Sequence, residues 1–398
     1  MNHPAGGTRW GHLAGMVSVA MAMAIGGCGQ STDVACSGKS GTICSWVGMG
    51  GEGAFNGDGL AMRQSALYWP MDLEFDATNR AYILDWQNHR VRRVNTDGKL
   101  ETVIGTDEIG DGPDSGDENV PPGVLGTSVN LNHPTDIQFA PDGTLYLAAW
   151  HNHKVRHYDP ATKLMDVSCG AGPGFKGDGM PAAGALLYHP KGMALSPMTG
   201  ALYIVDARNF RVRRIAAETP QIIDTVVGNG TLGFSGDGGP PLMASLNFQQ
   251  ASDNPEPGGA VALDAQDRLY LADTENERIR RVDFAANTIE TIVGNGNEGF
   301  SGDGGPATDA TVNHPRDIEF GPDGNLYIAD TDNHRVRMVD MTTGIITTVA
   351  GDGDATFGGD GGPATAASLW RPWGIAFDAK GDLFIADTFN NMIRKVAR

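Results

Sequence analysis

The chain has 398 residues, of which 40% are hydrophobic, enough to build a sizeable folded core. It carries 48 Asp and Glu residues against 29 Lys and Arg residues, a formal net charge of −19. A field of this sign repels the phosphates of nucleic acids and anionic lipid surfaces, so we expect no nucleic-acid partner.

The first 27 residues have the features of an export signal. Arg9 precedes an apolar run, residues 13–25, that is too short to span a bilayer permanently. The run ends in Ile-Gly-Gly-Cys28, which resembles a bacterial lipobox whose cysteine becomes the lipid-modified first residue. Ordinary secretion with cleavage elsewhere is the alternative. We therefore predict a lipoprotein signal peptide at 1–27, a bilayer anchor through acylated Cys28, and a location at the outer membrane or surface of a Gram-negative bacterium.

Residues 28–41 are rich in Ser, Thr and Gly, which predicts a flexible tether. Cys36 and Cys44 lie eight residues apart and could form a disulfide in an oxidising compartment. Cys169 is expected to be a small buried hydrophobic residue. The chain has no Cys-x-x-Cys pair, so no structural zinc site is indicated.

The rest of the chain repeats one motif. The copies begin at positions 57 to 67 residues apart, at Asn88, Asn152, Asn209, Asn276, Asn333 and Asn390. The fifth copy is the clearest, with two alternating strands around a Pro-Asp-Gly turn at 314–330, a third strand at 335–339 and a fourth at 345–350. The period and the strand pattern predict blades of four antiparallel strands.

A blade is stable only when it packs between neighbours in a closed ring, so the ends of the repeat array are informative. The last repeat stops at Arg398 after its third strand, while residues 42–48 match the fourth strand at 346–351. We therefore predict an all-β fold, a six-bladed β-propeller at 42–398, closed by an N-terminal strand that pairs into the last blade.

These residues resemble the NHL-repeat family, named for an Asn-His-Leu triplet that here reads Asn-His-Arg or a variant. The resemblance covers about residues 43–398. Bacterial NHL proteins with Gly-Phe-Ser-Gly-Asp-Gly-Gly-Pro loops are especially similar, and this loop occurs at 233–240 and 299–306. The resemblance implies the propeller fold but no single function, because six-bladed propellers serve as binding scaffolds and as enzymes.

Residues present in nearly every repeat are expected to serve the blade itself. One such set is Arg92, Arg156, Arg213, Arg280, Arg337 and Arg394, and a second is Asp85, Asp206, Asp273, Asp330 and Asp387. We predict that they form ion pairs within each blade. Each repeat also has a Gly-Asp-Gly triplet, with its aspartate at Asp58, Asp111, Asp178, Asp237, Asp303 or Asp360. These triplets could bind calcium, but they lack the dense carboxylate spacing of calcium loops. We therefore favour a structural role in shaping the loop.

A comparison with the peptidyl-amidoglycolate lyases, six-bladed NHL-like enzymes, keeps an enzymatic alternative open. Their metal histidines include ones directly after the inner-strand proline, where this chain has Met71, Thr135, Lys191, Arg316 and Trp373. Asp72, Asp136 and Asp317, two residues after their prolines, match that family's calcium aspartate. The alternative function is therefore a metal-dependent hydrolase or lyase at an acidic channel mouth. The favoured binding function needs no cofactor, and calcium is the ion that the resemblance implies for the alternative. His133, His189 and His314 could approach the same mouth or be packed strand-entry residues.

Departures from the repeat predict a ligand site. The position after the loop aspartate holds Trp86 and Trp150 in the first two blades, where four other blades have Ala or Thr. Strand entries in blades one and six carry further aromatic residues. With His151 the expected ligand-binding residues are Trp69, Trp86, Trp150, His151, Trp370 and Trp373, although some of these rings must belong to the core between blades. Such aromatic surfaces suit sugars and peptides.

The expected function is a surface-anchored binding or scaffolding propeller for a protein, peptide or glycan ligand. The sequence makes no prediction of oligomeric state. Blade four carries an insertion at 249–256, which is either a partner contact or a neutral loop extension.

Overall fold

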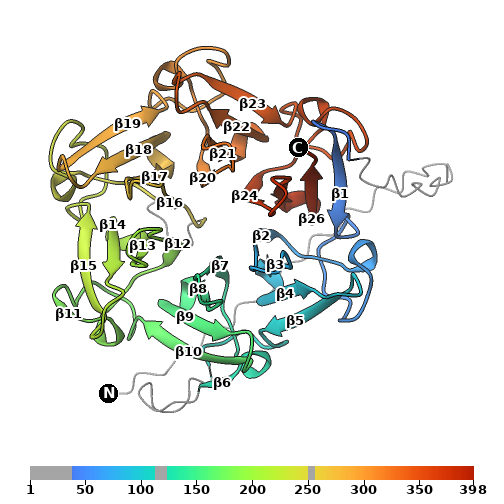
Figure 1. Ribbon diagram of the computed structural model, residues 1–398, viewed down its shortest axis with the longest axis horizontal. Coiled ribbons are helices and arrows are strands. Elements are labelled where there is room, and N and C mark those ends of the chain that lie inside the picture. Colours follow the sequence, from blue (N-terminus) through green and yellow to red (C-terminus); the bar gives the residue numbers. More distant parts are fainter. Residues whose placement is uncertain (1–37, 113–122, 250–255) are drawn as a thin grey trace, which may run out of the picture. The chain divides into compact units, whose positions relative to one another are not determined.

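The computed structural model describes residues 38–112, 123–249 and 256–398. The predicted signal peptide, Cys28 and Cys36 lie outside these ranges. The described residues form one compact unit, in which six antiparallel sheets are arranged as blades around a common centre (Figure 1). The six-bladed propeller predicted from the repeats is confirmed.

Each blade has four main strands, numbered from the centre outwards. Blade 1 contains β2 (Pro70–Phe75), β3 (Ala81–Asp85), β4 (Arg90–Val94) and β5 (Leu100–Ile104). Blade 2 contains β7 (Pro134–Phe139), β8 (Leu145–Ala149), β9 (Lys154–Asp159), β10 (Leu164–Cys169) and the short β6 (Val124–Leu125). Blade 3 contains β12 (Pro190–Leu195), β13 (Leu202–Asp206), β14 (Arg211–Ile215), β15 (Ile222–Val227) and the short β11 (Met180–Pro181).

The second half of the ring follows the same plan. Blade 4 contains β16 (Val261–Leu263), β17 (Leu269–Asp273), β18 (Arg278–Asp283) and β19 (Thr288–Val293). Blade 5 contains β20 (Pro315–Phe320), β21 (Leu326–Asp330), β22 (Arg335–Val339) and β23 (Ile346–Ala350). Blade 6 contains β24 (Pro372–Phe377), β25 (Leu383–Asp387), β26 (Met392–Val396) and β1 (Ile43–Val47).

Strand β1 closes the ring as predicted. It pairs antiparallel with β26, with Ile43 opposite Val396 and Ser45 opposite Arg394, and so supplies the outer strand of blade 6. Cys44 on this strand is disulfide-bonded, and its expected partner Cys36 lies outside the described residues. Cys169 is a free, buried thiol, as predicted.

Short 3₁₀ helices connect the strands. One series follows the second strand of each blade: η2 (Trp86–Asn88), η4 (Trp150–Asn152), η6 (Ala207–Asn209), η8 (Thr274–Asn276), η10 (Thr331–Asn333) and η12 (Thr388–Asn390). The other precedes the inner strands: η1 (Met62–Gln64), η3 (Gly126–Ser128), η5 (Ala182–Gly184), η7 (Pro241–Met243), η9 (Ala307–Asp309) and η11 (Ala364–Ala366). None of the described helices is long and apolar enough to cross a membrane.

The repeated arginines and aspartates form the predicted ion pairs. In blade 5 the fully buried Arg337 lies 2.6 Å from Asp303 of the Gly-Asp-Gly loop and 3.4 Å from Asp330. The Gly-Asp-Gly aspartates of the other blades also pair with their repeat arginines, at 2.7 to 3.5 Å. These carboxylates therefore hold the long loops onto the blades, in agreement with the structural interpretation.

Three kinds of side-chain hydrogen bond link one blade to the next. The first comes from the residue after the η helix of the first series in five of the six blades, the exception being Phe210 of blade 3; in all six this residue has a left-handed backbone with φ of 52° to 57°. Its side chain accepts the amide N–H that precedes the next inner strand. The pairs are Asn391–Trp69 at 2.9 Å, His89–His133 at 3.1 Å, His153–His189 at 3.3 Å, Glu277–His314 at 2.7 Å and His334–Arg371 at 3.2 Å.

The second link is a threonine hydroxyl that donates to the carbonyl of the next inner-strand proline, as Thr274, Thr331 and Thr388 do at 2.7 to 2.8 Å. The third is an inner-strand aspartate. It accepts an amide N–H from the neighbouring inner strand, and it is described below because it bears on the predicted metal site.

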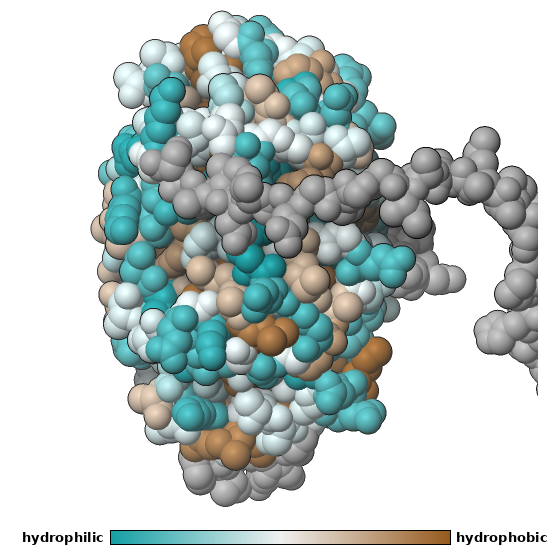
Figure 2. Space-filling view, turned by 90° about the vertical axis from the view of Figure 1, so that its right-hand side faces the viewer, coloured by the Kyte–Doolittle hydropathy of each residue, from teal (hydrophilic) through white to brown (hydrophobic). Residues whose placement is uncertain are grey.

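On the side of the unit seen in Figure 2, hydrophobic residues form small separate groups among hydrophilic ones. The uncovered part of this side therefore shows local apolar clusters among the described residues.

Candidate functional site

Aromatic side chains from blades 6 and 1 form one contiguous group around Trp69. Its indole stacks on Trp86, with ring centroids 5.8 Å apart and an interplanar angle of 12°, and on Phe389 at 4.8 Å and 18°. Trp370 meets Phe389 edge-on at 5.7 Å, and Trp373 lies 6.0 Å from Trp86. These five residues are hereafter the aromatic cluster. The predicted convergence of the tryptophans is thus present.

Local backbone geometry places these rings together. Trp69 precedes the inner-strand proline in a left-handed conformation, with φ of 50°, and its amide N–H is held by Asn391 of blade 6. Trp86 opens η2, and Phe389 is the middle residue of η12. Because the two helices occupy the same place in neighbouring blades, closure of the ring brings their side chains to either side of Trp69.

The members of the cluster differ in exposure. Trp370 is 40% exposed, Trp69 and Phe389 are half-buried, and Trp86 and Trp373 are buried. Trp370 therefore presents its ring to solvent, while the buried rings form the floor. The indole N–H groups of Trp86 and Trp373 are buried and make no hydrogen bond with a described residue. Unpaired buried donors are uncommon, and they mark places where a water or a ligand atom can complete the bonding.

Trp150 and His151 join the same sector through histidines of blades 2 and 3. Trp150 is buried and stacks on His151 at 4.1 Å, and His133 contacts His151 with 3.0 Å between the two Nδ1 atoms. The ring of His133 lies 4.7 Å from that of Trp86, which connects this group to the aromatic cluster. Burial lowers the pKa of His133 to about 3, and His89 and His151 act in the same direction, so this imidazole is neutral at pH 7. A ligand role for the predicted residues stays a prediction.

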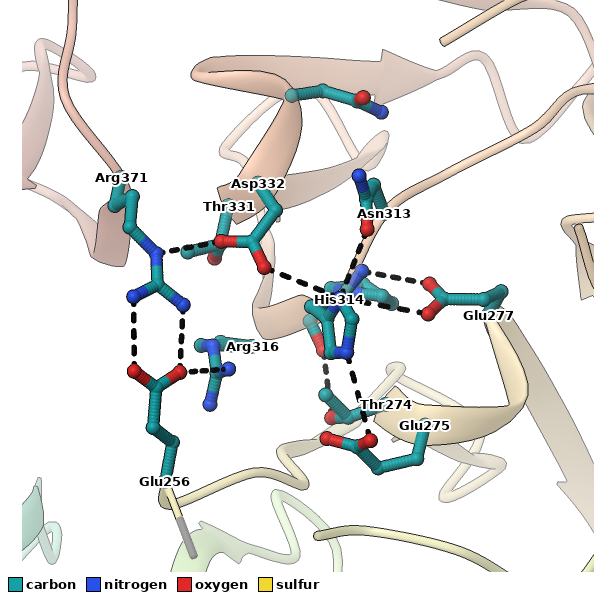
Figure 3. Close-up of polar contacts among 12 residues, drawn as sticks. Glu256, Thr274, Glu275, Glu277, Asn313, His314, Arg316, Thr331, Asp332 and Arg371 are labelled. Carbon is teal, nitrogen blue, oxygen red and sulfur yellow. Dashed lines mark hydrogen bonds and ion pairs between the residues drawn. The ribbon is translucent and has the colours of Figure 1, made fainter. Parts of the chain in front are cut away.

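Two arginines lie beside the aromatic cluster, and one carboxylate bridges them (Figure 3). Arg371 donates from Nη1 and Nη2 to the two oxygens of Glu256, at 2.9 and 2.6 Å, and Arg316 donates from Nη2 to Oε2 at 2.7 Å. The guanidinium of Arg316 lies 4.7 Å from the ring centroid of Trp373, and that of Arg371 lies 4.9 Å from Phe389. Arg316 and Arg371 are hereafter the arginine pair.

Glu256 ends the insertion of blade 4, yet it contacts side chains from blades 5 and 6. The network continues from Arg371 to Asp332 at 2.6 Å, and from Asp332 to Nδ1 of His314 at 3.2 Å (Figure 3). A hydrogen bond with Glu275 raises the pKa of His314. Burial alone would raise the pKa of Glu256, but hydrogen bonds from Arg371 and the charge of Arg316 outweigh it and lower that pKa. Glu256 is therefore ionised at neutral pH.

Sequence reasoning did not single out Glu256, Phe389 or the arginine pair as a site. One feature of the sequence could have pointed to Arg371. Arg371 stands where three other blades have histidine before the proline, and a departure at that position resembles the departure that drew attention to Trp69. The pairing with Glu256 itself could not be read from the repeat, because it joins two blades that are not neighbours.

The three aspartates predicted as metal ligands lie on inner strands and link neighbouring blades. Asp72 accepts the amide N–H of Ile137 at 3.0 Å, Asp136 that of Met193 at 3.1 Å, and Asp317 that of Ile375 at 2.8 Å. Each carboxylate thus joins its own blade to the next one. Among the described residues, no group of three or more His, Cys, Asp or Glu side chains is arranged to hold a metal ion.

The carboxylates on the channel side of the inner strands influence one another electrostatically. Burial raises the pKa of Asp72 to about 7, and the charge of Asp317 acts in the same direction. Burial and the charge of Asp72 raise the pKa of Glu74 to about 8. The charge of the buried Lys191 opposes the rise in the pKa of Asp72, and its ammonium group donates to the carbonyl oxygen of Arg316 at 2.8 Å. This bond runs from blade 3 to blade 5, so the lysine side chain reaches past the inner strand of blade 4.

Comparison with known proteins agrees with the repeat and the fold. A family model described as the teneurin NHL domain matches residues 260–357. The chain is 28% identical over 344 residues to the chloroplastic protein SUPPRESSOR OF QUENCHING 1 of Arabidopsis thaliana, and 25% identical over 352 residues to human NHL repeat-containing protein 2. These similarities support the NHL-repeat family predicted from the repeat. Each alignment covers 83% of this chain but only 30% and 46%, respectively, of those longer relatives.

Solved structures share the fold of this chain. A Bacteroides thetaiotaomicron protein of unknown function superposes with a TM-score of 0.65 and 20% identity, covering 89% of this chain and 75% of that one. An auxiliary nutrient binding protein from Bacteroides ovatus gives a TM-score of 0.61 and 15% identity, covering 89% and 76%. At these identities the likeness concerns the fold.

Proposed function

We propose that this propeller is a binding module that captures a peptide or glycan ligand on the aromatic cluster. The observation that carries the proposal is the contiguity of Trp69, Trp86, Trp370, Trp373 and Phe389, with one solvent-exposed indole above a rigid aromatic floor. Rigid aromatic side chains supply contact area at low entropic cost, and their faces suit sugar rings and extended peptides. Solved propellers of the same fold include proteins named auxiliary nutrient binding proteins, which supports a binding role.

The test is a comparison of three proteins on arrays of neutral and acidic oligosaccharides and of extended peptides. Trp370→Ala removes the exposed ring of the cluster. Phe300→Ala removes another exposed aromatic ring, 43% accessible, that belongs to a Gly-Asp-Gly loop and not to the cluster. We expect ligands of the parent protein to be lost in Trp370→Ala, with about tenfold or greater weakening, and kept in Phe300→Ala. Absence of any parent ligand, or ligands unaffected by Trp370→Ala, contradicts the proposal.

We also propose that Cys28 anchors the propeller in the cell envelope, which the lipobox-like sequence supports. Cys28→Ser should then move the protein from the detergent phase to the soluble fraction in phase partitioning. Retention of the unacylated variant in the membrane contradicts the anchor.

A metal-dependent hydrolase or lyase at the channel is the second candidate, with calcium as the expected ion. The raised pKa values of Asp72 and Glu74 favour it, because strongly shifted carboxylates gather at functional sites as well as in structural networks. Elemental analysis of the purified protein, and melting with and without chelator, test it. A melting temperature that the chelator leaves unchanged, together with no bound metal, removes this candidate.

A further inference from the structure

The arginine pair is the feature of the site that the proposed function does not yet use. We propose that Arg316 and Arg371 form a carboxylate subsite, that the ligand is a sugar bearing a carboxylate of the uronic-acid type, and that Glu256 fills this subsite when no ligand is bound. The inference rests on the proposed function, since the sugar ring would lie on the aromatic cluster.

The geometry is that of carboxylate recognition. Two nitrogens of Arg371 meet the two oxygens of Glu256 in a fork, and Arg316 adds a third donor at 2.7 Å. Planar, bidentate contacts of this kind suit carboxylates, and the group that occupies this one in the structure is itself a carboxylate. The chain as a whole carries a net charge of −19, which repels anions, whereas the arginine pair offers two positive charges that attract one. Such a field disfavours polyanionic partners and tolerates a ligand with a single carboxylate.

The subsite persists without Glu256 because other contacts hold the arginines. Arg316 also donates to the carbonyl of Pro257 at 2.6 Å, and Arg371 donates from Nε to Asp332 at 2.6 Å. Their guanidinium groups also lie on Trp373 and Phe389. The side chain of Glu256 is 43% exposed, whereas that of Arg316 is 1% exposed. Glu256 therefore meets the arginine pair from the solvent side, and a rotation of its side chain would vacate the pair.

The surroundings indicate a ring attached to the carboxylate. Phe389 contacts both Arg371 and Trp370, so a group held by the arginine pair is adjacent to the exposed indole. A pyranose presents C–H groups that pack on aromatic faces and hydroxyl groups that remain hydrated. Trp373, directly under Arg316, has an unpaired indole N–H that a hydroxyl oxygen can accept.

The experiment uses Glu256→Gln, which removes the competing charge and keeps the side-chain shape. The probes are methyl β-D-glucuronide, its neutral counterpart methyl β-D-glucoside, and an acetylated dipeptide with a free C-terminal carboxylate. Removing a competing charge-assisted contact should tighten glucuronide binding about tenfold or more relative to the parent, with little change for the glucoside. Glu275→Gln is the matched control, since Glu275 contacts His314 and not the arginines, and it should bind as the parent does. Arg371→Gln should lose the preference for the glucuronide.

The outcomes separate this inference from the proposed function. If Glu256→Gln melts as a folded protein and binds glucuronide no better than the parent, or binds glucuronide and glucoside alike, the carboxylate subsite is overturned. In that case any glycan binding that depends on Trp370 still stands. If the dipeptide binds and the glucuronide does not, the assignment to a sugar is overturned. Equal tightening in Glu256→Gln and Glu275→Gln would trace the effect to net charge and would also overturn the subsite.

Discussion

Trp150 and Trp370 are both departures from the repeat, and their environments predict opposite consequences of truncation. Trp150 is 1% exposed and belongs to a core cluster made mainly of residues from blades 1 and 2, and its ring lies 4.1 Å from that of His151 and 4.6 Å from that of His189 at the start of blade 3. Trp150→Ala leaves a cavity that surrounding strands cannot close, because the side chain is held between two rigid blades. We expect a loss of about 3–5 kcal/mol in the free energy of unfolding.

Trp370 makes one edge-on contact with Phe389 and leaves 40% of its surface in solvent. Trp370→Ala should therefore change the free energy of unfolding by about 1 kcal/mol or less. Denaturant unfolding of the parent and both variants at one pH measures the two values, with equal slopes showing that the unfolded states are comparable. A Trp150→Ala variant as stable as Trp370→Ala would refute the placement of Trp150 in the core and the reasoning from exposure.

Three further predictions concern closure, blade linkage and pH. Deleting residues 42–48 removes β1 and exposes the edge of β26, so the variant should aggregate on size exclusion, and a monomer that melts like the parent would show closure elsewhere. Thr331→Val removes the hydroxyl bond to Pro372 and should cost about 1 kcal/mol in denaturant unfolding, whereas Thr308→Val at an exposed position should cost nothing measurable. Burial, with the charge of Asp72, raises the pKa of Glu74 from 4.5 to about 8, so its proton stabilises the fold below pH 4.5 and that stabilisation is lost as the pH rises through 8. Glu74→Gln should flatten the fall of the melting temperature over this range, and parallel pH profiles of the two proteins would contradict it.

Repetition explains why the fold could be predicted in detail. Six copies in register gave the strand order, and the match between residues 42–48 and 346–351 located the closing strand within a residue of β1. The ion pairs of Arg337 and its equivalents followed from the same argument, because a residue required in every blade meets the same partners in every blade.

Single-copy features were harder to predict because their partners lie in other blades. The sequence brought Trp86, Trp150 and Trp370 to one sector but could not divide them between core and surface, since that depends on how neighbouring blades pack. The hydrogen bond from the amide N–H of Ile375 to the carboxylate of Asp317 was not predicted either, because it depends on how blade 5 packs against blade 6; the calcium role of Asp317 stays a prediction. Glu256 and Arg371 are 115 residues apart, and no local sequence pattern predicts their contact.

The interfaces between neighbouring blades differ in how many side-chain hydrogen bonds they contain. Among the described residues, none of the three interblade links joins blades 3 and 4. Phe210 stands where other blades have an accepting side chain, Pro257 has no amide N–H to offer, and Ala207 and Gly192 occupy the threonine and aspartate positions. The inner strand there, β16, has three residues where the others have six. Blades 3 and 4 still touch through Ser196 and Asp267, whose side chains hydrogen bond at 2.6 Å. Because these three links are missing, we expect local unfolding to begin at the interface between blades 3 and 4. Amide protons of β16 should then exchange with solvent sooner than those of β20 or β24.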